Sequence, residues 1–339
     1  MYDKLSQVRR FVGGKRVRTN TDKRLQIFSG TRHPELAEKV AKKLGLKVSD
    51  TGVEYFANGE MKCHLEESVR GGDVFIFQTH NASVGESIME QAIIIDAAKR
   101  ASARHITAVC PFLGYARQDR KSSKREPITA RLVVDILSVA GADRIVSVDL
   151  HAGQIQGYFD GPFDHLIGLP ALVKYLKKRY KGDDLVVVSP DAGRVKLAER
   201  YASRLGCDVA IVHKRRPGKN RAEVIDVIGV VKDKRAIIID DMIDTAGTMC
   251  AAAELLMKRG AKAVSAAATH GIFSDPAISR IEKSPIDHLV VTDTLPLPEA
   301  KKSSKIISVV TISDLLADAV KAIFEESSVS VIFEGLNQS

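Results

Sequence analysis

The sequence predicts two tandem doubly wound α/β domains, each with a mostly parallel sheet. From Leu25 onward, short apolar runs rich in β-branched residues alternate with longer amphipathic runs, which is typical of strands and helices that follow one another. The second half repeats the first, because Gly141 precedes an expected strand that ends in His151, and Gly260 precedes one that ends in His270. A single large sheet is the alternative, but this repeat and the length of 339 residues favour two domains.

In the first half, Val53–Leu65 predicts a hairpin, since Ala57-Asn58-Gly59 is a typical hairpin turn. A helix is expected from Pro34, with Gly45 as its stop. The other expected helices are Ser83–Ala101 and Ile128–Ala140, and the other expected strands are Leu25–Phe28, Val74–Gln78, His105–Cys110 and Arg144–Val148.

In the second half, Lys214–Asn220 is expected to form a basic turn between two extended segments. The expected helices are Leu172–Tyr180, Val195–Leu205 and Asp314–Glu325, and the expected strands are Leu185–Val188, Val209–His213, Val224–Val230, Ala236–Ile239, Ala263–Ala268, His288–Val291 and Ile306–Val310. We therefore divide the chain into a basic arm (1–23), an N-terminal domain (24–165) on which the segment 322–339 packs, and a C-terminal domain (166–321).

The composition is that of a globular protein, with 45% hydrophobic and 27% charged residues. No apolar run approaches the roughly 20 residues that span a bilayer, so we expect no membrane association. The four cysteines show no C-x-x-C spacing, which favours free thiols in a reducing, cytoplasmic compartment.

The N-terminal arm carries most of the net charge of +9. No apolar segment follows its cations, which excludes a signal peptide. Such an arm could contact nucleic acid or another acidic surface, but basic tails are more often simply solvated, and we expect no nucleic-acid partner.

Residues 235–248 combine a strand, two carboxylates and a loop of small residues. Ala236–Ile239 predicts a strand buried on both faces, and an amphipathic helix follows the loop and ends near Gly260. Free N–H groups and the helix dipole suit a phosphate monoester, while Asp240 and Asp241 could hold the hydroxyls of a ribose. An ordinary βα turn is the alternative, but it does not account for two adjacent aspartates after an isoleucine-rich strand.

A second unusual loop, residues 114–127, carries five cations between Arg117 and Arg125 and no apolar anchor between Ala116 and Pro127. Such a loop is expected to be mobile until an anion orders it. The chain has neither G-x-x-x-x-G-K-[ST] nor G-x-G-x-x-G, so neither common nucleotide-binding loop is available.

Residues 240–248 resemble the ribose-phosphate loop of the type I phosphoribosyltransferase fold. Together with three further stretches they resemble the signature motifs of the ribose-phosphate pyrophosphokinase family: Tyr115–Lys121, Asp149–Gly157 and Ser189–Gly193. The resemblance runs from about residue 25 to Phe333, which leaves only the basic arm outside. It implies transfer of the diphosphoryl group of Mg²⁺-bound ATP to ribose 5-phosphate, giving 5-phosphoribosyl 1-diphosphate and AMP.

The resemblance also implies residue roles. The sugar phosphate would be held by Asp240, Asp241, Asp244, Thr245, Ala246, Gly247 and Thr248. Lys214, Arg216 and His151 would be catalytic, and His151 and Asp191 would be the metal-associated pair. ATP would contact Arg117 and Gln118, while Phe56, Asn58 and Glu60 would reach the adenine of a neighbouring subunit.

Several of these residues have ordinary structural interpretations. His151 could be a satisfied histidine at a strand end, and Asp191 could cap a helix, which is compatible with a metal role. Phe56 taken alone predicts a core residue and Asn58 a turn residue. Lys214–Arg216 could be a solvated charged hairpin.

By the same resemblance, Ser68, Arg70, Ser328 and Ser330 would form an allosteric site that binds inorganic phosphate or ADP at a subunit contact. Solvent-facing serines of an edge strand are the alternative. The resemblance also implies a homo-oligomer, a hexamer in the family.

The sequence departs from the family pattern at three positions. Arg194 stands where the family usually has a second glycine, Ser122 where an acidic residue is common, and Glu126 where a small residue is common. Two other classes share parts of the pattern. A phosphoribosyltransferase usually has a single such domain, and a non-catalytic regulatory homologue would not need Lys214, Arg216, His151 and Asp191 intact.

Overall fold

The computed structural model describes residues 23–81, 83–218, 221–298 and 304–330, together with the short strands β1 (Phe11–Val12) and β2 (Lys15–Arg16). For residues 214–218 and 221–225 it describes the backbone alone. The expected basic arm therefore lies outside the described residues, apart from the antiparallel pairing of β1 with β2.

The first half forms a six-stranded sheet whose strands are all parallel, in the order β10-β9-β8-β7-β3-β4. The strands are β3 (Leu25–Ser29), β4 (Val48–Ser49), β7 (Asp73–Phe77), β8 (His105–Cys110), β9 (Arg144–Val148) and β10 (Phe163–Leu166). Helices α2 (Val84–Arg100) and α3 (Thr129–Ala140) share a buried cluster with one face of this sheet, and α1 (Pro34–Lys43) packs in the cluster on the other face. Alternate strand residues therefore enter different cores.

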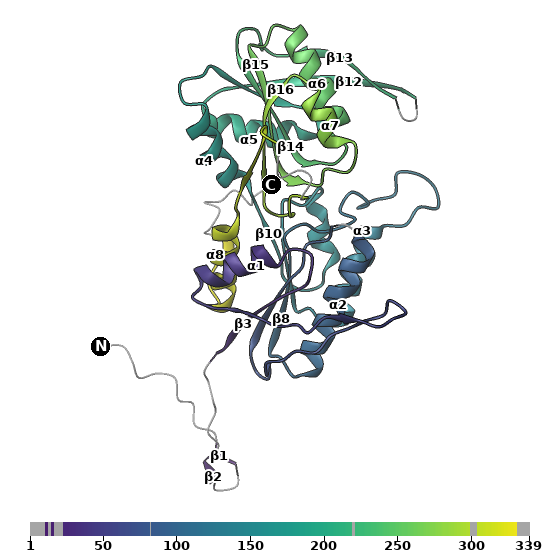
Figure 1. The fold of residues 1–339 in the computed structure, drawn as a ribbon, viewed down its shortest axis with the longest axis vertical. Coiled ribbons are helices and arrows are strands. Elements are labelled where there is room, and N and C mark those ends of the chain that lie inside the picture. The colour runs from purple at the N-terminus through teal and green to yellow at the C-terminus, as the bar shows by residue number, and fades with distance from the viewer. Residues whose placement is uncertain are drawn as a thin grey trace, which may run out of the picture.

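The second half forms a seven-stranded sheet in the order β13-β12-β11-β14-β15-β16-β17, parallel except for the hairpin of β12 and β13. Its strands are β11 (Leu185–Ser189), β12 (Asp208–Gly218), β13 (Arg221–Ile228), β14 (Arg235–Ile243), β15 (Ala263–Gly271), β16 (Ile286–Thr292) and β17 (Ile307–Val310). Helices α4 (Leu169–Arg179) and α5 (Val195–Leu205) cover one face, and α6 (Gly247–Lys258) and α7 (Ala277–Glu282) the other. Figure 1 shows the two sheets as two lobes stacked along the long axis.

Most expected elements are present within one to three residues of the expected bounds. One expectation was wrong: residues 214–218 belong to β12 rather than to a turn, so Lys214 and Arg216 lie on a strand of the long β12–β13 hairpin. The cationic pattern gave no sign that the strand continues through it. The short elements that were not expected include β4, β10, α7 and the 3₁₀ helix η1 (Gly153–Tyr158).

Near its C-terminal end the chain returns to the first half. Helix α8 (Ser313–Phe324) lies beside α1 in the lower lobe, where the yellow and purple helices meet in Figure 1. Lys43 forms an ion pair with Asp314, and Lys23 forms one with Glu326. The mixed α/β fold with mostly parallel sheets is thus confirmed. Among the described residues, no helix is long and apolar enough to cross a membrane.

Asp149 joins the two halves just beyond the end of β9. Its carboxylate accepts hydrogen bonds from the Thr269 hydroxyl on β15 and, at 3.0 Å, from the Gly168 amide, while its carbonyl lies 3.1 Å from Nε2 of His270. Burial raises the pKa of Asp149, although these donors act in the opposite direction. The backbone of Asp149 has φ +39°, which is uncommon for a residue other than glycine. The end of β9 is therefore fixed by the second sheet.

Replacing Thr269 with valine keeps the side-chain volume but removes a donor from the buried Asp149 carboxylate. We expect the free energy of unfolding to fall by about 1–3 kcal/mol, the usual cost of leaving a buried acceptor without its partner. Denaturant unfolding of the wild-type chain and Thr269→Val measures this difference. An unchanged midpoint and slope would show that the junction does not depend on this hydrogen bond.

Candidate active site between the two sheets

The two aspartates expected after β14 are part of the strand. β14 lies between β11 and β15 in the middle of the second sheet, and it continues through Asp240 and Asp241 to Ile243. Asp240 pairs with Ala268 of β15, which keeps the backbone of the acidic pair in the sheet. The carboxylates therefore project from a rigid element, at the edge of a parallel sheet where ligands commonly bind.

The small-residue loop ends at the N-terminus of α6. Ala246 has φ +59°, and the helix begins at Gly247. Arg280 of α7 reaches this loop, since its Nη1 donates to the Thr245 carbonyl over 2.6 Å and lies 3.1 Å from where a Cβ on Gly247 would stand. The positive charge of Arg280 thus lies beside the N-terminus of α6, whose free amides already attract anions. Sequence reasoning missed Arg280, because nothing in its local pattern connects it to a loop 35 residues away.

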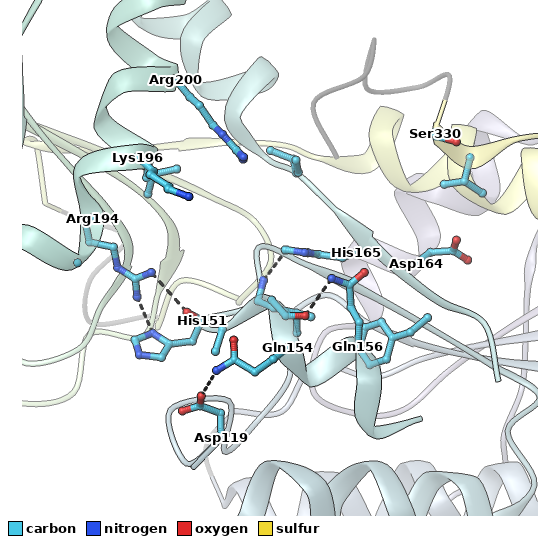
Figure 2. Close-up of a pocket in the computed structure, with 18 of the residues that line it drawn as sticks. Asp119, His151, Gln154, Gln156, Asp164, His165, Arg194, Lys196, Arg200 and Ser330 are labelled. Atoms are coloured by element: carbon cyan, nitrogen blue, oxygen red, sulfur yellow. Dashed lines mark hydrogen bonds between the residues drawn. The ribbon is translucent and has the colours of Figure 1, made fainter. Parts of the chain in front are cut away.

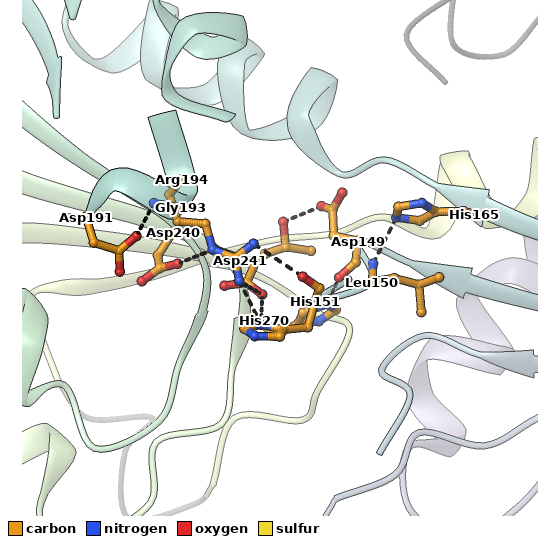
Figure 3. Close-up of polar contacts among 11 residues, drawn as sticks. Asp149, Leu150, His151, His165, Asp191, Gly193, Arg194, Asp240, Asp241 and His270 are labelled. Carbon is orange, nitrogen blue, oxygen red and sulfur yellow. Dashed lines mark hydrogen bonds and ion pairs between the residues drawn. The ribbon is translucent and has the colours of Figure 1, made fainter. Parts of the chain in front are cut away.

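His151, Asp241 and Arg194 meet where the two halves face each other (Figure 3). Nδ1 of His151 lies 2.7 Å from Oδ2 of Asp241. Nη2 of Arg194 lies 2.7 Å from the same oxygen and from the same ring nitrogen, and Nε lies 3.3 Å from Oδ1 of Asp240. The structure thus brings together the predicted His151, Asp240 and Asp241, and it adds Arg194.

The two carboxylates have opposite pKa directions. Burial raises the pKa of Asp240, and its hydrogen bond with Asp241 and the negative charge of that neighbour raise it further. Burial alone would also raise the pKa of Asp241, but hydrogen bonds from His151 and Asp240 and the positive charge of Arg194 outweigh it, so the pKa is lowered. Asp241 is thus the carboxylate that its neighbours hold ionised.

A cavity of about 1390 Å³ opens beside this cluster (Figure 2). Its wall includes His151, Asp191 and Ser330 from three separate segments. Its five cationic side chains, Arg120, Arg144, Arg194, Lys196 and Arg200, outnumber its three carboxylates, Asp119, Asp164 and Asp191. A wall with this charge suits a polyanion, and the volume is large enough for a nucleotide.

Asp191 caps the 3₁₀ helix η2 (Ala192–Arg194), because its Oδ1 accepts from the Gly193 amide at 3.0 Å. The capping interpretation is therefore confirmed, and the carboxylate also lines the cavity with His151. Among the described residues, no group of three or more histidines, cysteines or carboxylates is arranged to hold a metal ion. Any ion at this wall would need further ligands from water or substrate.

The cationic loop is anchored at its start. Asp119 is buried, its carboxylate accepts from Nε2 of Gln154 in η1, and its carbonyl accepts from the Tyr158 hydroxyl. Arg117 forms a 2.8 Å ion pair with Asp244 of the small-residue loop. The Gln118 side-chain carbonyl accepts from the Thr129 hydroxyl at 2.6 Å. Polar contacts thus hold this loop, although it lacks the apolar anchor. Through Asp244, Arg117 also contacts the second half of the chain.

The two departures in this loop are partners of each other. The Glu126 carboxylate accepts hydrogen bonds from the amides and hydroxyls of Ser122 and Ser123, with distances of 2.7–2.8 Å. These bonds, the Ser123 hydroxyl first, lower the pKa of Glu126 to about 2. Glu126 therefore closes this turn from its far end, whereas the family commonly has an acidic residue at position 122.

None of the five predicted ATP residues lines the large cavity, since Arg117 and Gln118 line a smaller one of about 560 Å³ with Asp244 and the other three lie further away. Phe56, Asn58 and Glu60 form the exposed tip of the expected hairpin, β5 (Glu54–Tyr55) and β6 (Met61–Lys62). The Phe56 ring is 54% exposed, so it is not the core residue that it would be expected to be when taken alone. The hairpin does not line the cavity of this chain, which leaves its predicted contact with a neighbouring subunit open.

The four predicted allosteric residues do not form one site within the chain. Ser68 and Arg70 are exposed on either side of buried Val69, and Ser68 lines a cavity beside β3. Ser328 and Ser330 share a 2.8 Å hydrogen bond, and Ser330 lines the large cavity. Of the predicted catalytic cations, Lys214 and Arg216 have side chains outside the described part of the chain.

Comparisons with known proteins follow the same division into halves. A family model described as the N-terminal domain of ribose phosphate pyrophosphokinase matches residues 25–141, and one described as the phosphoribosyl synthetase-associated domain matches residues 218–334.

Similar whole chains are also known. Ribose-phosphate pyrophosphokinase of Caldanaerobacter subterraneus subsp. tengcongensis is 52% identical over 91% of this chain and 98% of its own length. The protein of that name from Bifidobacterium longum is 51% identical over 92% and 93%. A crystal structure of phosphoribosylpyrophosphate synthetase from Mycobacterium smegmatis is similar with a TM-score of 0.85 and 49% identity, over 90% of this chain and all of that one.

Glu126→Ala removes the acceptor that closes the turn at Ser122 and Ser123. We expect trypsin to cut the Arg/Lys-rich loop several times faster, because the released turn fits a protease more easily. Glu38→Ala changes an exposed glutamate of α1 and serves as the control. Cleavage rates measured by mass spectrometry that are equal in all three proteins would contradict a closed turn.

Proposed function

The chain belongs to the ribose-phosphate pyrophosphokinase family, and from this premise we propose that it transfers the β,γ-diphosphoryl group of ATP to the 1-hydroxyl of ribose 5-phosphate. The products are 5-phosphoribosyl 1-diphosphate, which serves nucleotide biosynthesis, and AMP. The observation that carries this function is the meeting of His151 from the first half with Asp240 and Asp241 from the second, beside one cation-lined cavity.

Ribose 5-phosphate occupies the loop before α6. Its phosphate accepts from the backbone amides of Asp244 to Thr248 and faces the positive end of the α6 dipole. The Arg280 guanidinium, already at the Thr245 carbonyl, adds charge on the outer side of the loop. The vicinal hydroxyls of the sugar then donate to Asp240 and Asp241 on β14, which directs the 1-hydroxyl toward the cavity.

ATP binds in the cavity with its phosphates among the cations of the wall other than Arg194, which pairs with the two aspartates. Arg117 and Gln118, which line a smaller cavity of about 560 Å³ together with Asp244, contact ATP from the start of the cationic loop when that loop, its turn closed by Glu126, folds over the nucleotide. Since Arg117 forms an ion pair with Asp244, the same arginine links the ATP loop to the sugar loop. The adenine is reached by Phe56, Asn58 and Glu60 of a second copy, whose hairpin is exposed in this chain.

The reaction needs no covalent intermediate on the protein. The 1-hydroxyl attacks the β-phosphorus in line, the bond from the α–β bridging oxygen to the β-phosphorus breaks, and AMP leaves with that oxygen. Positioning and fixed cations carry the catalysis, because charge spreads over the moving phosphates. Lys214 and Arg216 supply two of these cations from the β12–β13 hairpin, and closure of the loop excludes the water that would hydrolyse ATP.

The residues at the cavity wall fit Mg²⁺ that is bound mainly through substrate phosphates. One carboxylate, Asp191, and one imidazole, His151, are too few for a cage of protein ligands, and Mg²⁺ in such sites keeps waters and phosphate oxygens as its other ligands. Bound there, the ion would neutralise phosphate charge.

We further propose self-association and regulation. Tyr55, Phe56, Met89, Leu132 and Val139 expose large apolar side chains on the hairpin, α2 and α3 of the first half, as surfaces do that contact another subunit. In a hexamer such contacts would bring Ser68 and Arg70 of one copy to Ser328 and Ser330 of another, forming a pocket for inorganic phosphate or ADP. All four cysteines are free thiols, in keeping with a cytoplasmic enzyme.

Incubation with MgATP and ribose 5-phosphate, followed by separation of the nucleotides, tests the function. We expect AMP and 5-phosphoribosyl 1-diphosphate in equal amounts. ADP as the product would indicate an ordinary kinase. No nucleotide product would indicate a regulatory homologue, and turnover that consumes 5-phosphoribosyl 1-diphosphate and a base would indicate a phosphoribosyltransferase.

A further inference from the structure

Arg194 lies among the side chains of the proposed sugar site. It directly follows the Ser189–Gly193 motif, at a position where the family usually has a second glycine. It is the last residue of η2 and precedes α5, so its backbone is fixed by the Asp191 cap on one side and by the helix on the other. Its side chain turns toward β14 and is only 20% exposed. Both the backbone and the side chain of Arg194 are therefore fixed in position.

The guanidinium joins both carboxylates and His151 (Figure 3). Nε lies 3.3 Å from Oδ1 of Asp240, and Nη2 lies 2.7 Å from Oδ2 of Asp241. Nη1 lies 3.4 Å from the carbonyl of His151. The planar fork of arginine suits such a contact, because its donors have fixed directions, whereas lysine offers a single point charge.

The acidic pair needs such a partner. Asp240 and Asp241 are adjacent, their side chains are 22% and 7% exposed, and the negative charge of Asp241 raises the pKa of Asp240. A single cation bridging both offsets the buried negative charge and fixes both side-chain rotamers. Without it, the two carboxylates would turn apart or toward solvent.

The arrangement leaves acceptors for a diol. Besides the hydrogen bond between the two carboxyl groups, the contacts from Arg194, His151 and the Asp241 amide reach Oδ1 of Asp240 and Oδ2 of Asp241. A carboxylate has about four acceptor sites, so the remaining sites on each can receive one hydroxyl. Two carboxylates held side by side therefore match two neighbouring hydroxyls of one sugar.

We propose that Arg194 is a positioning residue that determines selectivity for the ribose diol, by holding Asp240 and Asp241 in the arrangement that accepts both the 2- and the 3-hydroxyl. This inference rests on the proposed function. Arg194 acts through the carboxylates and touches neither the sugar nor the transferred group. Its effect therefore falls on sugar binding and on the choice between ribose and 2-deoxyribose.

Arg194→Met keeps the length and apolar stem of the side chain and removes the fork. We expect the KM for ribose 5-phosphate to rise at least about tenfold, as befits the loss of charge-assisted hydrogen bonds, while the KM for ATP stays within about twofold. The preference for ribose 5-phosphate over 2-deoxyribose 5-phosphate, measured as a ratio of kcat/KM, is expected to fall by about the same factor. Arg194→Lys should recover part of that preference.

Lys196→Met is the matched control, since Lys196 lines the same cavity two residues further along, in the first turn of α5. We expect this variant to keep the wild-type preference between the two sugars. Combining Arg194→Met with Asp240→Asn should add little to the loss from Asp240→Asn alone, because the arginine works through that carboxylate.

A purely structural role would give a different result. In that case Arg194→Met would weaken both substrates equally and leave the sugar preference unchanged, and that result would overturn the inference whatever the melting temperature. If Arg194→Met does not fold, the sugar preference of Arg194→Lys decides, since an unchanged preference overturns the proposal. Failure of the wild-type chain to release AMP would instead overturn the proposed function, so the two failures are distinguishable.

Discussion

The contact between His151, Asp241 and Arg194 is the interaction on which the site depends, because it joins three elements that are remote in the sequence. His151 follows β9 of the first sheet, Asp241 lies on β14 in the middle of the second, and Arg194 precedes α5. A cation, an imidazole and a buried carboxylate hold one another only while the two sheets keep their relative position. The Asp149 junction, two residues before His151, maintains that position through Thr269 and Gly168.

The fold explains why the chemistry lies at this place. Both sheets are mostly parallel, and the functional side chains follow or end their strands, as in other doubly wound proteins. The stacking of the two lobes turns those ends toward each other (Figure 1). The carboxylates that we propose bind the sugar stand on a rigid strand, whereas Arg117 and Gln118, which we propose contact ATP, stand on a loop held by side-chain contacts. Rigid sugar binding and a closing loop suit a transfer that depends on alignment and exclusion of water.

Periodicity predicted most of the fold, because long apolar runs bounded by glycines leave little choice between strand and helix. Periodicity failed at residues 214–218, where the charged sequence predicts a turn. β12 continues to Gly218 there because it pairs with β13. The strand with its acidic pair and the loop of small residues before α6 were predictable from residues 235–248. The partners of these residues were not. Arg194 showed only as a departure from a family pattern, Arg280 gave no local signal, and Ser122 and Glu126 seemed two separate departures until the structure paired them.

The central claim is that Asp240, Asp241 and the loop from Asp244 to Thr248 form the sugar-phosphate site. A crystal structure of the chain with ribose 5-phosphate tests it most directly. The account predicts the phosphate on the backbone amides of the loop at the α6 N-terminus, and the 2- and 3-hydroxyls on the two aspartates beside Arg194. A phosphate bound instead among Lys196 and Arg200 in the large cavity, with the aspartates untouched by the sugar, would contradict it.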